Sequence, residues 1–171
     1  MRVNPSKSSL RTPETRLVLF RVGRVQYGIP IECVREVINP QQVFEMPEPV
    51  PFITGVTDYR GEVVPVLDMR LKLDLPPLDD PSAIRKSKWI LMNVNEGPQE
   101  KLVAVVVDTV VDVLTTSEPL RAHPAKHGLD SQDVLGVLPA NELGFVFVLS
   151  AMAIRRHVAS FDNADFSENI T

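Results

Sequence analysis

Two of the three histidines in this chain have a spacing that could bind a metal ion. His123 and His127, in the stretch HPAKH, lie four residues apart. On a helix this spacing would place both imidazoles on one face, where they could chelate zinc. The zinc-protease pattern also requires a glutamate directly after the first histidine, but Pro124 stands there, and Pro124 and Gly128 disfavour a regular helix. We therefore expect no metal site, and a metal-dependent hydrolase built on this pair is kept only as an alternative.

The carboxylates and the cysteine indicate no catalytic centre either. Asp108 and Asp112 lie four residues apart, and in a strand this spacing separates their side chains by about 13 Å, too far for a tight acid–base pair. We interpret both as polar residues at turns or strand edges. Cys33 is the only cysteine, which excludes an intrachain disulfide and a multi-thiolate zinc site, and we interpret it as a small buried hydrophobe. Phosphate-loop, dinucleotide and nucleophile-elbow motifs are absent from the sequence, so we expect neither catalysis nor a cofactor.

An arginine between two apolar runs is the most informative local feature. In GVTDYRGEVVPVLD, residues 55–68, Arg60 and Gly61 interrupt an otherwise strand-like sequence. Such an arginine is either paired and structural or exposed for a partner. Pro65 lacks a backbone N–H and therefore belongs at a sheet edge or a bulge. This places Arg60 near an irregular, accessible edge.

Length and charge limit the class of protein. The 171 residues are enough for one ordinary domain with an apolar core, and 44% of them are hydrophobic. No run approaches the roughly 18 apolar residues that a membrane span needs, and the N-terminus lacks a secretory signal, so we expect a cytoplasmic protein without direct membrane insertion. The net charge is −4 without a basic stripe, which argues against nucleic-acid binding.

Short runs rich in β-branched residues, bounded by turn residues, predict an all-β fold. The predicted strands cover residues 16–22, 25–31, 62–68, 89–94, 102–114 and 145–149. Gly23 and Arg24 are predicted to form a hairpin turn between the first two. The three prolines of MPEPVPF, residues 46–52, predict an extended connection outside any sheet.

Helix is predicted at only a few places. In IECVREVI, residues 31–38, apolar residues recur at spacings of three and four, which predicts about two helical turns. Ser150 is predicted to cap a C-terminal helix over AMAIRRHVASF. The alternating pattern of LDMRLKLDL, residues 67–75, predicts a strand.

Four blocks of the sequence together resemble the CheW-like domain family. FITGVTDYRGEVVPVLDMRLKLDL is similar to the family's Arg-Gly turn and the Val-Pro strand that follows it. LFRVGRVQYGIPIECVREVI, LVAVVVDTVVDVLTTSEPLRAHP and VLGVLPANELGFVFVLSAMAI resemble its opening strands and first helix, its long valine-rich segment, and its closing strand pair and helix. The blocks occur in the family's order, and the resemblance covers about residues 15–158.

The resemblance implies a fold of two packed, five-stranded SH3-like β-barrels, mostly β with short helices and a C-terminal helix. It places the first barrel at roughly 23–80 and the second at roughly 15–22 plus 85–150. Residues 1–14 and 159–171 are expected to be disordered or flexible tails. It also implies that the second half of residues 67–75 is helical rather than extended.

The resemblance implies a non-catalytic adaptor of bacterial chemosensory signalling. Members couple methyl-accepting chemoreceptors to a CheA-type histidine kinase, and other CheW-like proteins are further partners in array rings. The chain is expected to stand alone, without a receiver domain, and to be recruited from the cytoplasm to receptor clusters. The alternative from another class is a small β-barrel that binds a ligand or nucleic acid.

The resemblance also implies where the partners bind. Glu36 matches the acidic residue that pairs with the arginine of the Arg-Gly turn, so a Glu36–Arg60 bridge between helix and turn is predicted. A receptor helix would lie in a groove whose six residues are Val34, Glu36, Ile38, Gly55, Val56 and Arg60. Val34, Ile38 and Val56 would form the apolar floor of this groove, and Gly55 and Gly61 would keep it open. The alternative is that Val34 and Val56 are merely core residues. Kinase binding is expected on the second barrel, at about 89–149, with no single residue assigned.

The chain departs from the family at the turn itself. Asp58 and Tyr59 stand where Asn and Leu are most common, which adds a negative charge and a phenol beside the expected groove. A different receptor preference is implied.

Overall fold

The computed structural model describes residues 13–94, 100–122, 129–140 and 144–159, and within them the chain forms two five-stranded sheets. The strands are β1 (Thr15–Val22), β2 (Val25–Pro30), β3 (Val34–Ile38), β4 (Ile53–Tyr59), β5 (Glu62–Asp68), β6 (Lys88–Asn93), β7 (Leu102–Val107), β8 (Thr109–Thr116), β9 (Val134–Pro139) and β10 (Phe145–Leu149). The helices are a 3-10 turn, η1 (Ile31–Cys33), and α1 (Met69–Lys72), α2 (Pro81–Lys86) and α3 (Met152–Val158). The predicted all-β class is confirmed. No described helix has the length and apolar character needed to span a bilayer.

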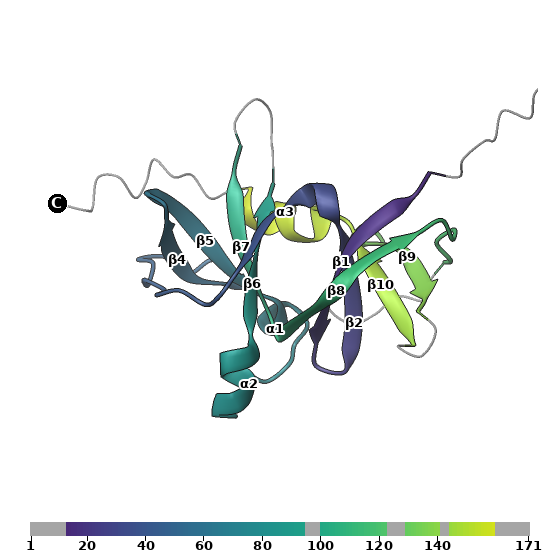
Figure 1. Cartoon of the computed structure of the whole chain (residues 1–171). Helices are drawn as coiled ribbons and strands as arrows, with labels where there is room; N and C mark the ends of the chain where they lie inside the picture. Colours follow the sequence, from purple (N-terminus) through teal and green to yellow (C-terminus); the bar gives the residue numbers. More distant parts are fainter. Residues whose placement is uncertain (1–12, 95–99, 123–128, 141–143, 160–171) are drawn as a thin grey trace, which may run out of the picture.

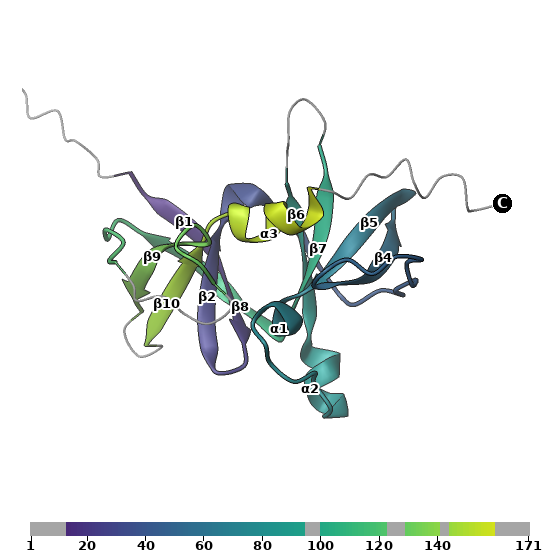
Figure 2. The ribbon, with the colours of Figure 1, turned by 180° about the vertical axis from the view of Figure 1, so that it is seen from behind.

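The two sheets lie side by side, and α3 lies across the space between them (Figures 1 and 2). The first barrel has the strand order β3-β6-β7-β5-β4, and the second has the order β8-β1-β2-β10-β9. The predicted division of the chain is therefore wrong. The Gly23–Arg24 hairpin keeps β2 beside β1 in the second barrel, while β6 and β7 pair with β3 and β5 in the first. The range 89–149, predicted to belong to the second barrel, consequently spans both.

Both barrels are built on the same plan. Each contains one parallel pair, β5 with β7 and β10 with β2. In each, an isolated bridge joins a crossing segment to a strand, Phe44 to Val56 in the first barrel and Arg121 to Val137 in the second. A glycine precedes the bridged valine in both cases, because the crossing chain leaves no room for a side chain there.

Three apolar clusters follow from this arrangement. One cluster, including Trp89 and Leu91, belongs to the first barrel alone, and another, including Leu17 and Leu138, belongs to the second. The largest cluster draws buried residues such as Phe20 from both barrels and from α3. Burial of apolar surface therefore joins the barrels as well as filling them.

The valine-rich run at 102–114 is two strands rather than one. β7 belongs to the first barrel and β8 to the second, and Asp108 lies at the break between them. Its carboxylate accepts hydrogen bonds from the Gly23 backbone N–H (2.8 Å) and from Arg70 Nε and NH2 (2.8 and 2.6 Å). The interpretation of Asp108 as a polar residue at a turn is confirmed. Its side chain also connects the β1–β2 hairpin to α1.

The prediction of a helix over residues 31–38 is wrong beyond the first turn. Only η1 is helical, and Val34–Ile38 form β3, which pairs with β6. Alternating half-buried and exposed residues along β3 fit a strand at the rim of a barrel. The β-branched residues of this stretch favour the strand once β6 is available as a partner.

Two other helix predictions change in detail. The strand predicted through residue 75 ends at Asp68, whose Oδ1 accepts the Arg70 N–H (2.8 Å) and thereby caps α1. The implied helical turn therefore exists and begins at Met69. Ser150 does not cap α3, because its hydroxyl donates to the Gln132 carbonyl (2.8 Å).

A buried ionic cluster joins α1 and α3. Lys72 Nζ lies 3.6 Å from Asp133 Oδ2, and both side chains are 1% exposed. The same ammonium group is 2.8 Å from His157 Nε2 on α3. Arg156 NH2 donates to Asp133 Oδ2 (2.6 Å) and its NH1 pairs with Asp130. The cluster ties the first barrel to the C-terminal helix.

Stability is expected to fall in mild acid because of His157. Burial, with the nearby Lys72 and Arg156 cations, lowers the pKa of His157 to about 4. The unfolded chain binds this proton near pH 6.5, so it holds more protons than the folded chain between about pH 6.5 and pH 4. The contribution of His157 is fully present above that window and is lost as the pH falls through it. Urea unfolding at pH 7 and pH 5 should show this loss, and His157→Gln should reduce it. An equal loss in both proteins would contradict the assignment.

Candidate partner-binding site

The β4–β5 turn holds Arg60 in a backbone conformation that arginine seldom adopts. Tyr59 pairs with Glu62, so Arg60 and Gly61 form a two-residue turn with φ values of 50° and 84°. Two positive φ angles are the mark of the type I′ hairpin turn, where Asn-Gly is preferred. The Gly61 N–H donates to Asp58 Oδ1 (2.8 Å) and fixes the turn. An arginine at this position has a local conformational cost, and its presence despite this cost points to a role for its side chain.

Glu36, Tyr59 and Arg60 form one polar cluster between β3 and the turn. The Tyr59 hydroxyl donates to Glu36 Oε2, and Arg60 NH2 lies 3.5 Å from the same oxygen. The Arg60 guanidinium carbon is 5.0 Å from the centre of the Tyr59 ring. The predicted Glu36–Arg60 bridge is thus confirmed, although it joins a strand, rather than a helix, to the turn.

The cluster displays Arg60 rather than burying it. The Arg60 side chain is 71% exposed and that of Glu36 is 39% exposed. An exposed ion pair of this kind contributes only about 0–1 kcal/mol to stability. The Glu36 carboxylate, which accepts a hydrogen bond from the Tyr59 hydroxyl, raises the pKa of Tyr59. Tyr59 and Glu36 therefore hold the Arg60 guanidinium at the surface, where most of it is open to solvent.

An exposed aromatic residue, Phe44, lies beside the same hollow as Arg60. Phe44 is 49% exposed, and it exchanges two backbone hydrogen bonds with Val56 (2.7 and 2.9 Å). A hollow of about 460 Å³ beside it is bounded by residues of the 41–44 segment and of the β4–β5 hairpin, including Thr57 and Arg60. Sequence reasoning missed Phe44. The available signal was an aromatic residue after the polar pair Gln41–Gln42, in a segment without strand or helix periodicity.

The six residues predicted for the groove do not share one surface. Glu36 and Arg60 lie together, as described. Val56 is 8% exposed and belongs to the large core cluster, and the half-buried Val34 packs against the same cluster. Ile38 packs against the core of the first barrel instead. The alternative that Val34 and Val56 are core residues fits these positions.

Gly55, the sixth residue, allows the 41–44 segment to cross β4. A Cβ at this position would overlap the Phe44 carbonyl oxygen and would come within 2.7 Å of Val43 Cγ1. Gly61 differs, because a Cβ there would meet nothing within 4 Å. The two glycines thus serve close approach and turn geometry, respectively.

Gly55→Ala is expected to lower the free energy of unfolding by about 1–3 kcal/mol, because the added methyl group overpacks this crossing. Chemical denaturation would measure the change. Glu62→Ala, at an exposed position of β5, is the control and should stay within about 0.5 kcal/mol of wild type. Equal effects of the two substitutions would contradict the close-approach argument.

Metal binding has no support from the part of the chain described. Among those residues no three His, Cys, Asp or Glu side chains are grouped so that they could hold an ion. His123 and His127, the pair considered for zinc, lie outside the described residues.

Comparison with known proteins gives consistent matches. The family model of the CheW-like domain matches residues 16–158. The chain is 32% identical over 120 residues to "Chemotaxis protein CheW" of Klebsiella aerogenes, covering 70% of this chain and 68% of that protein. It is 31% identical over 132 residues to "Probable chemotaxis protein CheW" of Rhizobium etli, covering 76% and 81%. The fold is similar to that of the scaffolding protein TtCheW from Thermoanaerobacter tengcongensis, with a TM-score of 0.68 and 19% identity over 87% and 90% of the two chains.

Proposed function

Because the chain belongs to the CheW-like domain family, we propose that it is a non-catalytic adaptor that couples methyl-accepting chemoreceptors to a CheA-type histidine kinase. The match over residues 16–158 is the observation that carries the proposal, since it covers all ten strands except Thr15 and includes α3. The adaptor works in the cytoplasm and is recruited to receptor clusters. Its partners are the receptor tip, the kinase regulatory domain and other CheW-like proteins.

The receptor tip binds where Arg60 is displayed. A helix laid against the first barrel would present residues at spacings of three and four. A carboxylate on that helix would pair with the exposed Arg60 guanidinium, and an apolar neighbour would cover Phe44. Glu36 and Tyr59 position the guanidinium, while Val34, Ile38, Gly55 and Val56 support the surface from beneath. Support comes from the strained turn, which holds a charged side chain where Asn or Gly would be easier.

The kinase binds the second barrel. Of the range first assigned to this contact, β8, β9 and β10 belong to this barrel, and β1 and β2 complete the same sheet. A kinase contact on this barrel leaves the Arg60 surface of the first barrel available, so one chain can hold both partners at once.

Arg60→Asn separates partner binding from stability. Asparagine suits the first position of a type I′ turn, so the melting temperature is expected to stay within a few degrees of wild type. Binding to a purified receptor-tip fragment is expected to weaken at least about tenfold, because an exposed arginine anchor is lost. Isothermal titration calorimetry measures the affinity, and binding to the kinase regulatory domain should be unchanged.

The matched control is Arg85→Asn, which removes an exposed arginine from α2. It should leave both affinities unchanged. If Arg60→Asn bound the receptor fragment as tightly as wild type, the proposed receptor surface would be misplaced. If wild type bound neither the receptor nor the kinase fragment, the adaptor function itself would be contradicted.

A further inference from the structure

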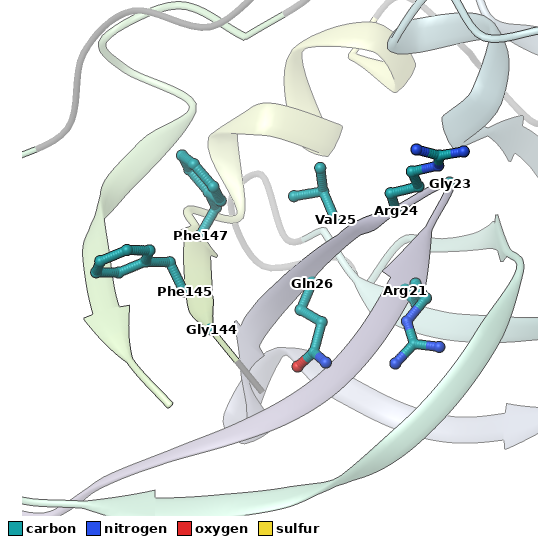
Figure 3. A pocket seen from close by; sticks show the side chains of 8 residues that line it. All are labelled: Arg21, Gly23, Arg24, Val25, Gln26, Gly144, Phe145 and Phe147. Carbon is teal, nitrogen blue, oxygen red and sulfur yellow. The ribbon is translucent and has the colours of Figure 1, made fainter. Parts of the chain in front are cut away.

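A hollow of about 590 Å³ opens in the second barrel, at the N-terminal ends of β2 and β10. These two parallel strands first pair at Gln26 and Val146. The residues before these two, which lie on either side of the hollow, are therefore not paired with each other. Figure 3 shows the residues that line it. They are Arg21, Gly23, Arg24, Val25, Gln26, Gly144, Phe145 and Phe147. The hollow lies in the other barrel from Arg60 and is separate from the candidate site above.

The lining has two chemically different sides. Arg21 and Gln26 are directly opposite each other in the β1–β2 pair, so their side chains share one face of the sheet, as Figure 3 shows. Val25 precedes Gln26 and therefore faces the other way. Phe147 pairs with Tyr27, two residues after Val25, and thus lies on the Val25 face. One side of the hollow is polar and cationic, and the other is apolar.

Gln26 leaves a buried acceptor beside the hollow. The residue is only 6% exposed, and its Oε1 is buried without a hydrogen-bond donor among the described residues. A buried acceptor without a donor costs about 1–3 kcal/mol, so such groups normally have a partner. A bound molecule with an N–H group would supply one.

The charge of the lining is one-sided. Arg21 and Arg24 are exposed, and no acidic residue is among the eight that line the hollow. Guanidinium groups bind carboxylates through paired hydrogen bonds. Opposite them, the Phe145 ring is 59% exposed and offers an apolar contact surface.

From this geometry we propose that the hollow binds an extended peptide segment whose side chains alternate between carboxylate and apolar. An extended chain directs successive side chains to opposite sides. A segment between the two strand ends would therefore direct carboxylates to Arg21 and apolar side chains to Val25 and Phe147. Its backbone N–H groups supply donors for Gln26 Oε1. The proposed kinase contact lies on the same barrel but has no residue assigned to it. The peptide is an additional partner, and its binding does not depend on the proposed adaptor function.

A peptide fits the hollow better than a small molecule or a nucleic acid. Small-molecule sites usually bury most of the ligand. This hollow is open to solvent, since the Phe145 ring that lines it is exposed. Nucleic acid would meet a chain of net charge −4 with only two arginines at the site. A segment with alternating side chains makes use of both sides of the lining.

The test uses two fluorescein-labelled peptides of equal composition. One has the alternating sequence Glu-Phe-Glu-Leu-Glu-Val and the other has the block sequence Glu-Glu-Glu-Phe-Leu-Val. In an anisotropy titration with the full chain, the alternating peptide is expected to bind saturably and the block peptide to bind at least about tenfold more weakly. Equal affinities would overturn the proposal in favour of a simple anion site. The absence of saturable binding of the alternating peptide would also overturn it.

Charge reversal locates the binding. Arg21→Glu is expected to weaken the alternating peptide at least about tenfold. Arg16→Glu is the matched control, because Arg16 is exposed on the same strand but outside the hollow, and it should leave the affinity within about twofold. Phe145→Ser, at an exposed ring, is a second variant if Arg21→Glu fails to fold, and it should also weaken binding. Equal weakening by Arg16→Glu would overturn the proposal.

Discussion

Asp133→Ala is expected to lower the free energy of unfolding by about 3–5 kcal/mol, because it leaves a buried ammonium group without its carboxylate. The Lys72 and Asp133 side chains are each 1% exposed. Burial lowers the pKa of Lys72, and Asp133 is the largest influence that opposes this lowering. Arg156 and the Asp130 backbone N–H also lose the oxygen to which they donate.

Urea denaturation followed by circular dichroism would measure this loss. Asp130→Ala is the control, since its side chain is 53% exposed and also pairs with Arg156. Its Oδ1 accepts the Gln132 and Asp133 backbone N–H groups as well (2.8 and 3.1 Å), so the substitution should cost about 1–2 kcal/mol, less than Asp133→Ala. If both alanine variants had the same small effect, the cluster would not be the connection between α1 and α3 that its geometry implies.

Asp108→Ala is expected to lower the free energy of unfolding by about 2–4 kcal/mol, because three hydrogen bonds to a charged group are lost. Two of them come from Arg70, and the third comes from Gly23. Arg70 and Asp108 are each 17% exposed at the side chain, so solvent can replace these bonds only in part. The bonds connect α1 and the β1–β2 hairpin, which belong to different barrels.

Asp112→Ala is the matched control, four residues further along the chain. Asp112 is exposed, and its Oδ1 accepts only the local Val113 N–H (2.7 Å) among the described contacts. Its replacement should change stability by no more than about 0.5 kcal/mol. A double-mutant cycle with Arg70→Ala should give a coupling energy of about 1 kcal/mol or more for Asp108. Additive effects would contradict the bridge.

Local sequence pattern predicted most of the strands but not how they are shared between barrels. Runs of β-branched residues indicate a strand whichever sheet it joins, so β7 and β8 read as one segment. Their separation depends on Asp108, whose partners Gly23 and Arg70 are distant in sequence. The spacing of apolar residues also gave the wrong prediction at β3. It fits a short helix, but pairing with β6 makes the segment a strand.

The charged residues of the candidate site were predicted, but the surface around them was not. The resemblance indicated the Glu36–Arg60 pair, which lies within 3.5 Å. It gave no role to Tyr59, which stands at a position where the chain departs from the family pattern and donates to Glu36. Phe44 reaches the site through an isolated bridge to Val56, a contact that no local periodicity reveals. Gly55 was expected to open the groove, but its function is to let that segment cross.

The central claim, that this chain joins a receptor to a kinase, is tested most directly by co-sedimentation. Membranes carrying a methyl-accepting chemoreceptor would be mixed with a CheA-type histidine kinase, with and without the purified chain. We expect the kinase to sediment with the membranes only when wild type or Arg85→Asn is present, and to stay in the supernatant with Arg60→Asn. Kinase that sediments equally without the chain, or that stays in the supernatant with wild type, would contradict the claim.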